Sequence, residues 1–158
     1  MKQKNNQITL RFLAEPGDVN FGGKVHGGAV MKWIDQAGYA CAANWCGEYA
    51  VTVYVGGIRF IHPIQIGNLV EVRARLILTG TTSMHISVDV FSKKINKAEY
   101  RHNTHCIIIF VAMDEDGESS QVPKWEPETE EEKQLELHAR KLMTLRKGLE
   151  DEMGQFLV

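Results

Sequence analysis

The chain has 158 residues, which is enough for one domain with a buried core. Hydrophobic residues make up 44% of the chain, charged residues 24%, and the formal net charge is -2, so composition gives no electrostatic reason to expect a nucleic acid or a membrane as partner. No stretch approaches the roughly 18 apolar residues of a membrane-spanning helix, the N-terminus lacks the apolar segment of a signal peptide, and the three cysteines suit a reduced protein of the cytoplasm.

The first predicted element is a strand over residues 7–14, in which apolar and polar side chains alternate. A glycine-rich loop over residues 15–28 follows, and it leads into a helix over about residues 28–45, where Ala, Met, Trp and Gln replace β-branched runs. This helix is apolar on most sides, as expected for a helix that a curved sheet covers.

Four segments with period-two patterning come next and are predicted to be strands. They cover residues 49–61, 69–78, 83–94 and 101–113. Gly56 and Gly57 mark a bulge or a close backbone approach in the first of them. Short links between the later strands favour an antiparallel meander, because parallel neighbours need long crossovers. A five-stranded antiparallel sheet wrapped around one long helix is the hotdog fold, which we predict for residues 1–123.

Residues 124–158 are predicted to form a charged C-terminal helix and tail. Thr129 and Glu132 fit a capping box at its start. Four leucines form one apolar stripe, which indicates packing on the same domain or on a partner subunit: Leu135, Leu142, Leu145 and Leu149. No catalytic role is expected for this segment.

Asp35 is the most unusual residue of the long helix, because the run around it is nearly all apolar or small. On a helix of 3.6 residues per turn it shares one stripe with Gly28, Lys32, Gln36 and Tyr39. Two interpretations are open. The stripe faces solvent with Asp35 paired to Lys32, or Asp35 takes part in chemistry.

The residues around the helix start favour chemistry. Gly27 and Gly28 leave amide donors free at the positive end of the helix dipole, where a developing oxyanion is stabilised. Asn20 and His26 lie just before them, and His26 is a candidate for contact with substrate. A carboxylate such as Asp35 can activate water against a polarised carbonyl or attack it directly to give an anhydride, and the sequence does not separate the two.

The spacing of these residues predicts a site shared by two subunits. Gly28 and Asp35 are seven residues apart, about 10 Å along the axis, whereas a base and an oxyanion donor must both lie within roughly 3 Å of one reacting centre. Two antiparallel helices in a dimer meet this requirement, with Gly28 and Asn20 of one subunit facing Asp35 of the other.

Other chemistries fit the sequence less well. It has no GxSxG motif, and "GDVNFGGKV" lacks the spacing of a phosphate loop. His102 and His105 are three apart on a predicted strand, which places them on opposite faces and argues against a metal site. His62 and His85 are interpreted as surface or satisfied residues.

Four stretches together resemble the hotdog-fold acyl-CoA thioesterases, namely the bacterial broad-range acyl-CoA hydrolases and the related cytosolic enzymes of animals: "NFGGKVHGGAVMKWIDQAG", "VTVYVGGIRFIHPIQIGNLVEVRARL", "GTTSMHISVDVFSKK" and "HCIIIFVAMDEDG". The resemblance covers roughly residues 7–123. It implies hydrolysis of fatty acyl-CoA to free acid and CoA, with no metal and no cofactor other than the CoA of the substrate. It also implies dimers, often assembled into hexamers, with Asn20, Asp35 and the glycines Gly27 and Gly28 at a site across the subunit interface.

The resemblance also assigns a CoA-binding segment after the third strand: Gly80, Thr81, Thr82, Ser83, Lys93 and Lys94. Arg59 and Arg101 are further candidates, because the CoA phosphates need cations. For each basic residue a solvated surface role stays open, and Gly80 and Thr81 equally fit a plain hairpin turn.

His26 departs from the family pattern, which often has a bulky apolar residue there. "HGG" followed by a helix aspartate is similar to the phenylacetyl-CoA-type hotdog thioesterases, so the acyl group stays open. Two other readings remain: a non-catalytic acyl-CoA-binding or sensor domain, and a hotdog dehydratase that uses His26 with a carboxylate.

Overall fold

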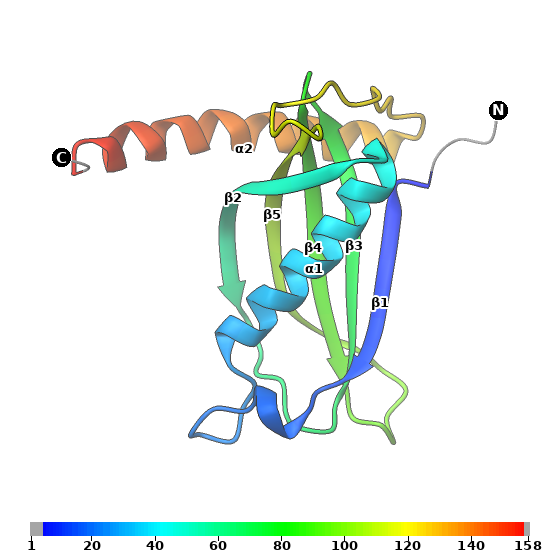
Figure 1. The fold of residues 1–158 in the computed structure, drawn as a ribbon. Helices are drawn as coiled ribbons and strands as arrows, with labels where there is room; N and C mark the ends of the chain where they lie inside the picture. The colour runs from blue at the N-terminus through cyan, green and yellow to red at the C-terminus, as the bar shows by residue number, and fades with distance from the viewer. Residues whose placement is uncertain (1–4, 157–158) are drawn as a thin grey trace.

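The structure, a computed structural model, describes residues 5–156. Figure 1 shows one long helix lying across one face of a sheet and a second helix at the sheet's end. The elements in chain order are β1 (Gln7–Leu13), the short 3-10 helix η1 (Pro16–Asp18), α1 (Gly27–Cys46), β2 (Tyr49–Phe60), β3 (Leu69–Thr79), β4 (Ser83–Lys93), β5 (Arg101–Met113) and α2 (Glu130–Gly154). The predicted hotdog fold is confirmed, and most of the predicted elements agree with these bounds to within two residues.

The sheet is antiparallel throughout, with the strand order β1-β3-β4-β5-β2. The meander holds for β3, β4 and β5, but β2 lies beside β5 at the far edge, and β1 takes the place next to β3. The link over residues 61–68 is short yet able to reach about 25 Å, whereas three strand spacings need only about 14 Å. The short link between β2 and β3 therefore does not require these two strands to be neighbours in the sheet. The bulge predicted at Gly56 and Gly57 is confirmed, with Gly57 at φ 70°.

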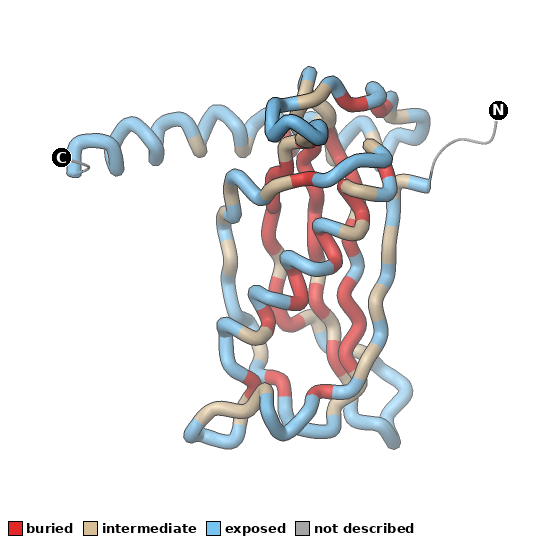
Figure 2. Tube along the Cα trace, in the orientation of Figure 1, coloured by how far each residue is buried: buried red, intermediate tan, exposed pale blue. Residues whose placement is uncertain are grey.

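The main core lies between α1 and the inner face of the sheet. Figure 2 shows buried residues along β3, β4 and β5 and on the side of α1 that faces them. The largest fully buried side chains of this layer are Ile34, Val70, Val72, Leu76, Met84, Ile86, Val88, Val90, Ile108 and Phe110. Since α1 buries one side here, its opposite side is left facing outward.

Gly38 is where α1 comes closest to the sheet. A Cβ built there would lie 2.9 Å from the Phe110 ring and 3.0 Å from Ile108. We expect Gly38→Ala to lower the free energy of unfolding by about 1–3 kcal/mol through overpacking. The matched control is Gly148→Ala in α2, where a new Cβ meets nothing within 4 Å and a gain of about 0.5–1 kcal/mol is expected. Denaturant unfolding measures both, and equal shifts for the two variants would contradict the close approach.

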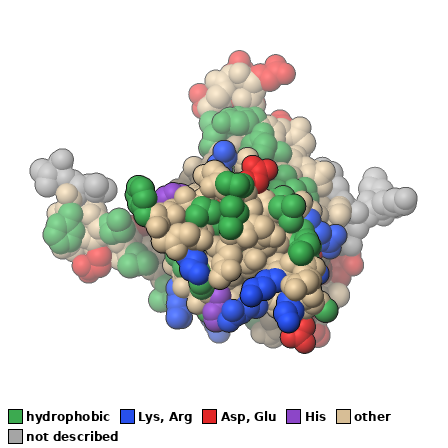
Figure 3. All heavy atoms as spheres, turned by 90° about the horizontal axis from the view of Figure 1, so that it is seen from below, with side chains coloured by type: hydrophobic (Ala, Val, Ile, Leu, Met, Phe, Trp, Pro, Cys, Tyr) green, Lys and Arg blue, Asp and Glu red, His purple; other side chains and the backbone are tan. Residues whose placement is uncertain are grey.

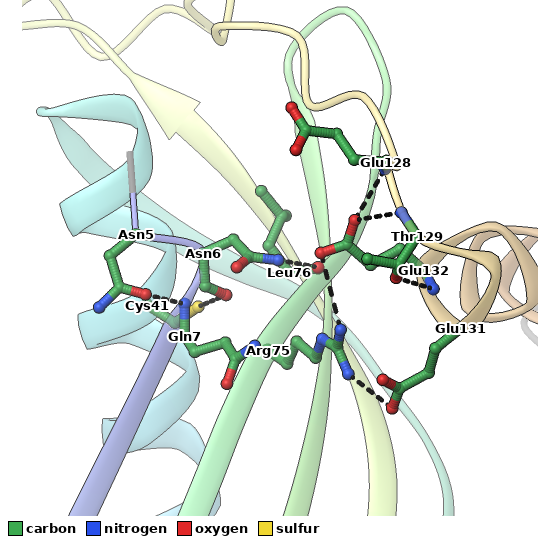
Figure 4. A network of polar contacts seen from close by, with 10 residues as sticks. All are labelled: Asn5, Asn6, Gln7, Cys41, Arg75, Leu76, Glu128, Thr129, Glu131 and Glu132. Atoms are coloured by element: carbon green, nitrogen blue, oxygen red, sulfur yellow. Dashed lines mark hydrogen bonds and ion pairs between the residues drawn. The ribbon is translucent and has the colours of Figure 1, made fainter. Parts of the chain in front are cut away.

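The second helix is attached to the outer face of the sheet. The predicted capping box is confirmed: Thr129 Oγ1 accepts a hydrogen bond from the Glu132 amide at 3.1 Å, and Glu132 Oε2 accepts one from the Thr129 amide at 3.2 Å. Arg75 of β3 forms ion pairs with Glu131 at 3.0 Å and Glu132 at 3.7 Å, as Figure 4 shows. The buried contacts come from Ile77, Leu78, Ile107, Ile109 and Ala139.

The second half of α2 extends beyond the edge of the sheet (Figure 1). Leu145 and Leu149 of the predicted leucine stripe are exposed there, whereas Leu135 and Leu142 pack on the protein's own sheet. Within residues 5–156, neither helix is long and apolar enough to span a membrane.

Candidate active site

Asn20 organises the loop in front of α1. Its Oδ1 accepts hydrogen bonds from the amides of Gly22 at 2.9 Å and Lys24 at 3.1 Å, and its side-chain NH₂ has no acceptor among the described residues. Asn20 and Gly27 line one cavity of about 380 Å³. Its other walls include Val30, Phe60, His62 and Asn103. Two of the residues predicted from the sequence therefore share one cavity.

The start of α1 presents backbone donors. His26 is the N-cap, with no side-chain capping bond, and its carbonyl accepts the Val30 amide at 3.1 Å. The amides of Gly27, Gly28 and Ala29 have no acceptor among the residues that the structure describes, as expected for a first helical turn. A Cβ at Gly28 would meet nothing within 4 Å, so this turn is open to an approaching group.

Asp35 lies on the outward side of α1 and is exposed in the protomer. Its Oδ1 accepts a hydrogen bond from Thr52 Oγ1 of β2 at 2.6 Å. In the described part of the chain Asp35 forms no ion pair with Lys32. The predicted pairing of Asp35 with Lys32 is therefore wrong, although the side chain is exposed in the protomer. Neither is Asp35 placed against the core, because Ile34, Ala37 and Gly38 occupy that side.

The predicted cations Arg59, Lys93, Lys94 and Arg101 belong to the end of the sheet where α1 begins. Lys93 pairs in register with Leu69 at the start of β3, and the Val25 amide donates to the Ile64 carbonyl just before that strand. Figure 3 views this end and shows Lys and Arg side chains gathered along one side. Arg101 Nη2 lies 3.5 Å from His62 Nδ1, which puts a guanidinium close to the cavity wall.

The turn over residues 80–83 lies at the other end of the sheet. β3 has 11 residues, so about 35 Å separate this turn from the start of α1. Two carbonyls of this turn bind other segments of the same protomer. The Thr81 carbonyl accepts the Val122 amide at 2.9 Å, and the Thr82 carbonyl accepts the Ala112 amide at 3.0 Å. Gly80 donates to the Ser83 carbonyl at 2.9 Å. Within one protomer, Gly80, Thr81, Thr82 and Ser83 form a hairpin turn away from the cavity.

The prediction that His102 and His105 lie on opposite faces is wrong. His102 Nε2 and His105 Nδ1 both contact Asp89 Oδ1, at 2.8 and 2.9 Å. Asn103 is the reason, because Thr104 pairs with Val90 and His102 with Phe91, so Asn103 is an extra residue in β5. Burial alone would raise the pKa of Asp89, but these two histidines lower it below its usual value. The described residues contain no group of three ligands placed to hold a metal ion.

Comparison with known proteins identifies the family. A family model of the thioesterase superfamily matches residues 22–99. The acyl-CoA thioester hydrolase YciA of Salmonella typhimurium is 34% identical over 120 residues, covering 74% of this chain and 90% of the relative. This chain belongs to the hotdog-fold acyl-CoA thioesterases. Two solved thioesterase structures superpose on most of this chain.

A crystal structure of an apo-hexameric acyl-CoA thioesterase superposes on this thioesterase with a TM-score of 0.86 at 31% identity, covering 90% of this chain and 92% of that one. The acyl-CoA hydrolase of Staphylococcus aureus, solved in complex with butyryl coenzyme A, coenzyme A and coenzyme A disulfide, gives a TM-score of 0.87 at 25% identity. The superposition covers 96% of this chain and 93% of the S. aureus chain, so α2 is included in the shared fold.

Sequence reasoning missed two polar residues of this thioesterase. Thr52 is the hydrogen-bond donor to Asp35, and its signal was a hydroxyl on the strand that directly follows the helix. Asn103 is 2% exposed and donates from Nδ2 to the His62 carbonyl at 3.1 Å, while its Oδ1 has no partner among the described residues. A polar residue in an otherwise apolar strand was the signal for Asn103.

Proposed function

We propose that this chain hydrolyses fatty acyl-CoA to a free acid and CoA, with CoA entering only as part of the substrate. The observation that carries the proposal is the open cavity at the start of α1, where Asn20 meets free backbone donors, in a chain that belongs to the thioesterases. The S. aureus relative, which was solved with coenzyme A and its butyryl ester, supports the substrate class.

In the proposed reaction the thioester carbonyl oxygen accepts hydrogen bonds from the amides of Gly28 and Gly27 and from the Asn20 side chain. Asp35 takes a proton from water, the resulting hydroxide adds to the carbonyl carbon, and the C–S bond breaks to release CoA, whose sulfur is then protonated. Direct attack by Asp35 through an anhydride gives the same products. In both routes the helix-start amides hold the charge that develops on oxygen.

We propose that the site is shared across a homodimer, with Gly28 of one subunit facing Asp35 of the other. The distance of about 10 Å along one helix supports this arrangement, as does the exposure of Asp35 in the protomer. The partner has a surface to bind, since β2 is a 12-residue edge strand with exposed apolar side chains. The exposed apolar side chains of β2 are Tyr49, Val53, Val55 and Phe60, and those of the neighbouring α1 are Met31 and Tyr39. Assembly of such dimers into hexamers is proposed from the hexameric relative.

The CoA phosphates are proposed to bind the cations at the end where α1 begins: Arg59, Lys93, Lys94 and Arg101. His26, exposed beside the glycines, is proposed to contact the substrate. The turn over residues 80–83 can join this site only from a neighbouring subunit, because it lies at the opposite end of its own protomer.

We propose that residues 1–123 form the thioesterase domain that carries the reaction, and that residues 124–158 form a charged helix and tail without a catalytic role.

A cytoplasmic location is also proposed, and the three free cysteines support it. Burial raises the pKa of Cys41 and of Cys106 to about 12, so these thiols stay protonated and serve as core residues.

The direct test measures release of free thiol from a panel of straight-chain acyl-CoAs together with phenylacetyl-CoA. Turnover of the straight-chain esters supports the proposal, and preference for phenylacetyl-CoA moves the acyl specificity to the other thioesterase type. Binding of CoA esters without turnover would establish a sensor domain. Water elimination from 3-hydroxyacyl substrates would establish a dehydratase.

Thr52→Val is expected to lower kcat about 10-fold or more with little change in KM, because a hydrogen bond to a charged group is worth about 1.5–3 kcal/mol. Thr52 holds Asp35 through one hydrogen bond, so its loss should leave the carboxylate free to turn away from its reactive orientation. Thr52→Ser keeps the hydroxyl and should restore kcat. A serine variant as slow as the valine variant would remove Thr52 from a positioning role.

A further inference from the structure

A second cavity lies on the outer face of the sheet, beneath the middle of α2. Its volume is about 280 Å³, and it is separate from the cavity at the start of α1. Most of its walls are apolar side chains, among them Ile107, Ile109, Leu142, Leu145 and Leu149. A space of this volume has room for about nine water-sized groups, and its polar side chains are Tyr54, His85, His105, His138 and Arg146.

His85 lines this cavity from β4 with an unpartnered ring. It is only 3% exposed, and neither ring nitrogen has a hydrogen-bond partner among the residues that the structure describes. Burial, together with the charges of Arg146 and Arg140, lowers the pKa of His85 to about 4. A neutral imidazole carries one N–H donor, so His85 offers an unused donor to this cavity.

Arg146 supplies a cation beside His85. Its guanidinium carbon lies 5.0 Å from the centroid of the Tyr54 ring, and its Nε lies 3.3 Å from Glu150 Oε1. In the described part of the chain its two terminal nitrogens have no partner, so they can form a two-pronged contact with a carboxylate. Arg140 does not line this cavity, so Arg146 is the arginine that faces it.

We propose that this outer cavity binds a medium-chain carboxylic acid, whose carboxylate contacts Arg146 and His85 and whose alkyl chain lies along the apolar wall. One anionic head and one apolar tail match the polar and apolar parts of the cavity, and its volume accommodates a chain of about eight to ten carbons. Inorganic phosphate would satisfy Arg146 alone and leave the apolar wall uncovered. The site does not depend on the activity proposed at Asp35.

Calorimetric titration of the full-length protein with decanoate, in the presence of saturating CoA to occupy the active site, tests the proposal. Arg146→Met should weaken decanoate binding about 10-fold or more, and Arg146→Lys should weaken it less. Leu142→Trp should abolish binding by filling the cavity. Lys147→Met is the matched control, because Lys147 is an exposed neighbour on α2 outside the cavity, and it should bind as the parent does. Decanol, which lacks the charge, should bind about 10-fold more weakly than decanoate.

Thiol release from acyl-CoA by the same variants separates this proposal from the proposed function. Arg146→Met should hydrolyse acyl-CoA at the parental rate while losing decanoate, and this combination supports the outer site. Equal decanoate affinity in the parent and Arg146→Met would overturn it. So would the absence of decanoate binding to the parent, or a smaller oligomer in Leu142→Trp, which would show that a second copy of the chain fills the cavity.

Discussion

Asp35→Asn is expected to lower kcat for acyl-CoA hydrolysis by about 10²–10⁴-fold, the usual contribution of a positioned general base. The amide keeps the shape of the side chain and can still accept from Thr52, but it cannot take a proton from water. Because Asp35 is exposed in the protomer, its replacement should change the free energy of unfolding by less than about 0.5 kcal/mol. Thiol release and thermal unfolding of the same preparation measure the two quantities.

Asp116→Asn is the matched control for this experiment, since Asp116 is an exposed aspartate in the turn after β5. It should keep the parental kcat. An Asp35→Asn variant that also keeps the parental kcat would remove Asp35 from the reaction. Single-turnover hydrolysis in ¹⁸O-labelled water then tests the anhydride route in the parent, because label enters the Asp35 carboxylate only when water attacks the Asp35 carbonyl of an anhydride.

Mixing two inactive variants is expected to restore activity. Asp35→Asn and Asn20→Ala each damage one half of the proposed shared site. In a mixed dimer one site combines the intact Asn20 of one subunit with the intact Asp35 of the other. Random exchange makes half of the dimers mixed, with one of two sites intact, so about a quarter of the parental activity should return. Refolding the two variants together and measuring thiol release gives the result.

Each variant refolded alone is the control for this mixing experiment and should stay inactive. A mixture no more active than its components would contradict the shared site and place the complete site within one subunit. The outcome does not depend on whether the dimers assemble further, because every site in a hexamer made of three dimers is still formed by one pair of subunits. The experiment therefore tests the interface and not the size of the assembly.

The strands and both helices were predictable because their side-chain periods are strong. β1, β3 and β4 alternate apolar and polar residues, and Thr129 with Glu132 marks the start of α2 locally. The position of β2 was not predictable, since a link of given length limits how far the next strand can lie but does not select its neighbour. Strand order depends on how α1 crosses the sheet, which is a property of the packed core.

The site was predictable where its residues are close in the chain. Asn20 and Gly27 meet because one loop connects them, and glycine and asparagine are typical of such a loop. Thr52 was missed because its contact with Asp35 depends on the register of β2 against α1, which no local pattern reports. The same limit applies to His85, whose burial against α2 depends on where that helix docks.

Asn103 is an extra residue in β5, and its position has a consequence for how this sheet tolerates changes in length. Because His102 and Thr104 already occupy consecutive positions opposite β4, deletion of Asn103 would leave every other side chain of the strand on its present face. The deletion would also remove two bonds to the neighbouring segment, because the Asn103 carbonyl accepts the Ile61 amide at 2.8 Å and Asn103 Nδ2 donates to the His62 carbonyl at 3.1 Å. Loss of this one residue would therefore keep the facing of β5 while detaching the segment that lines the cavity beside it.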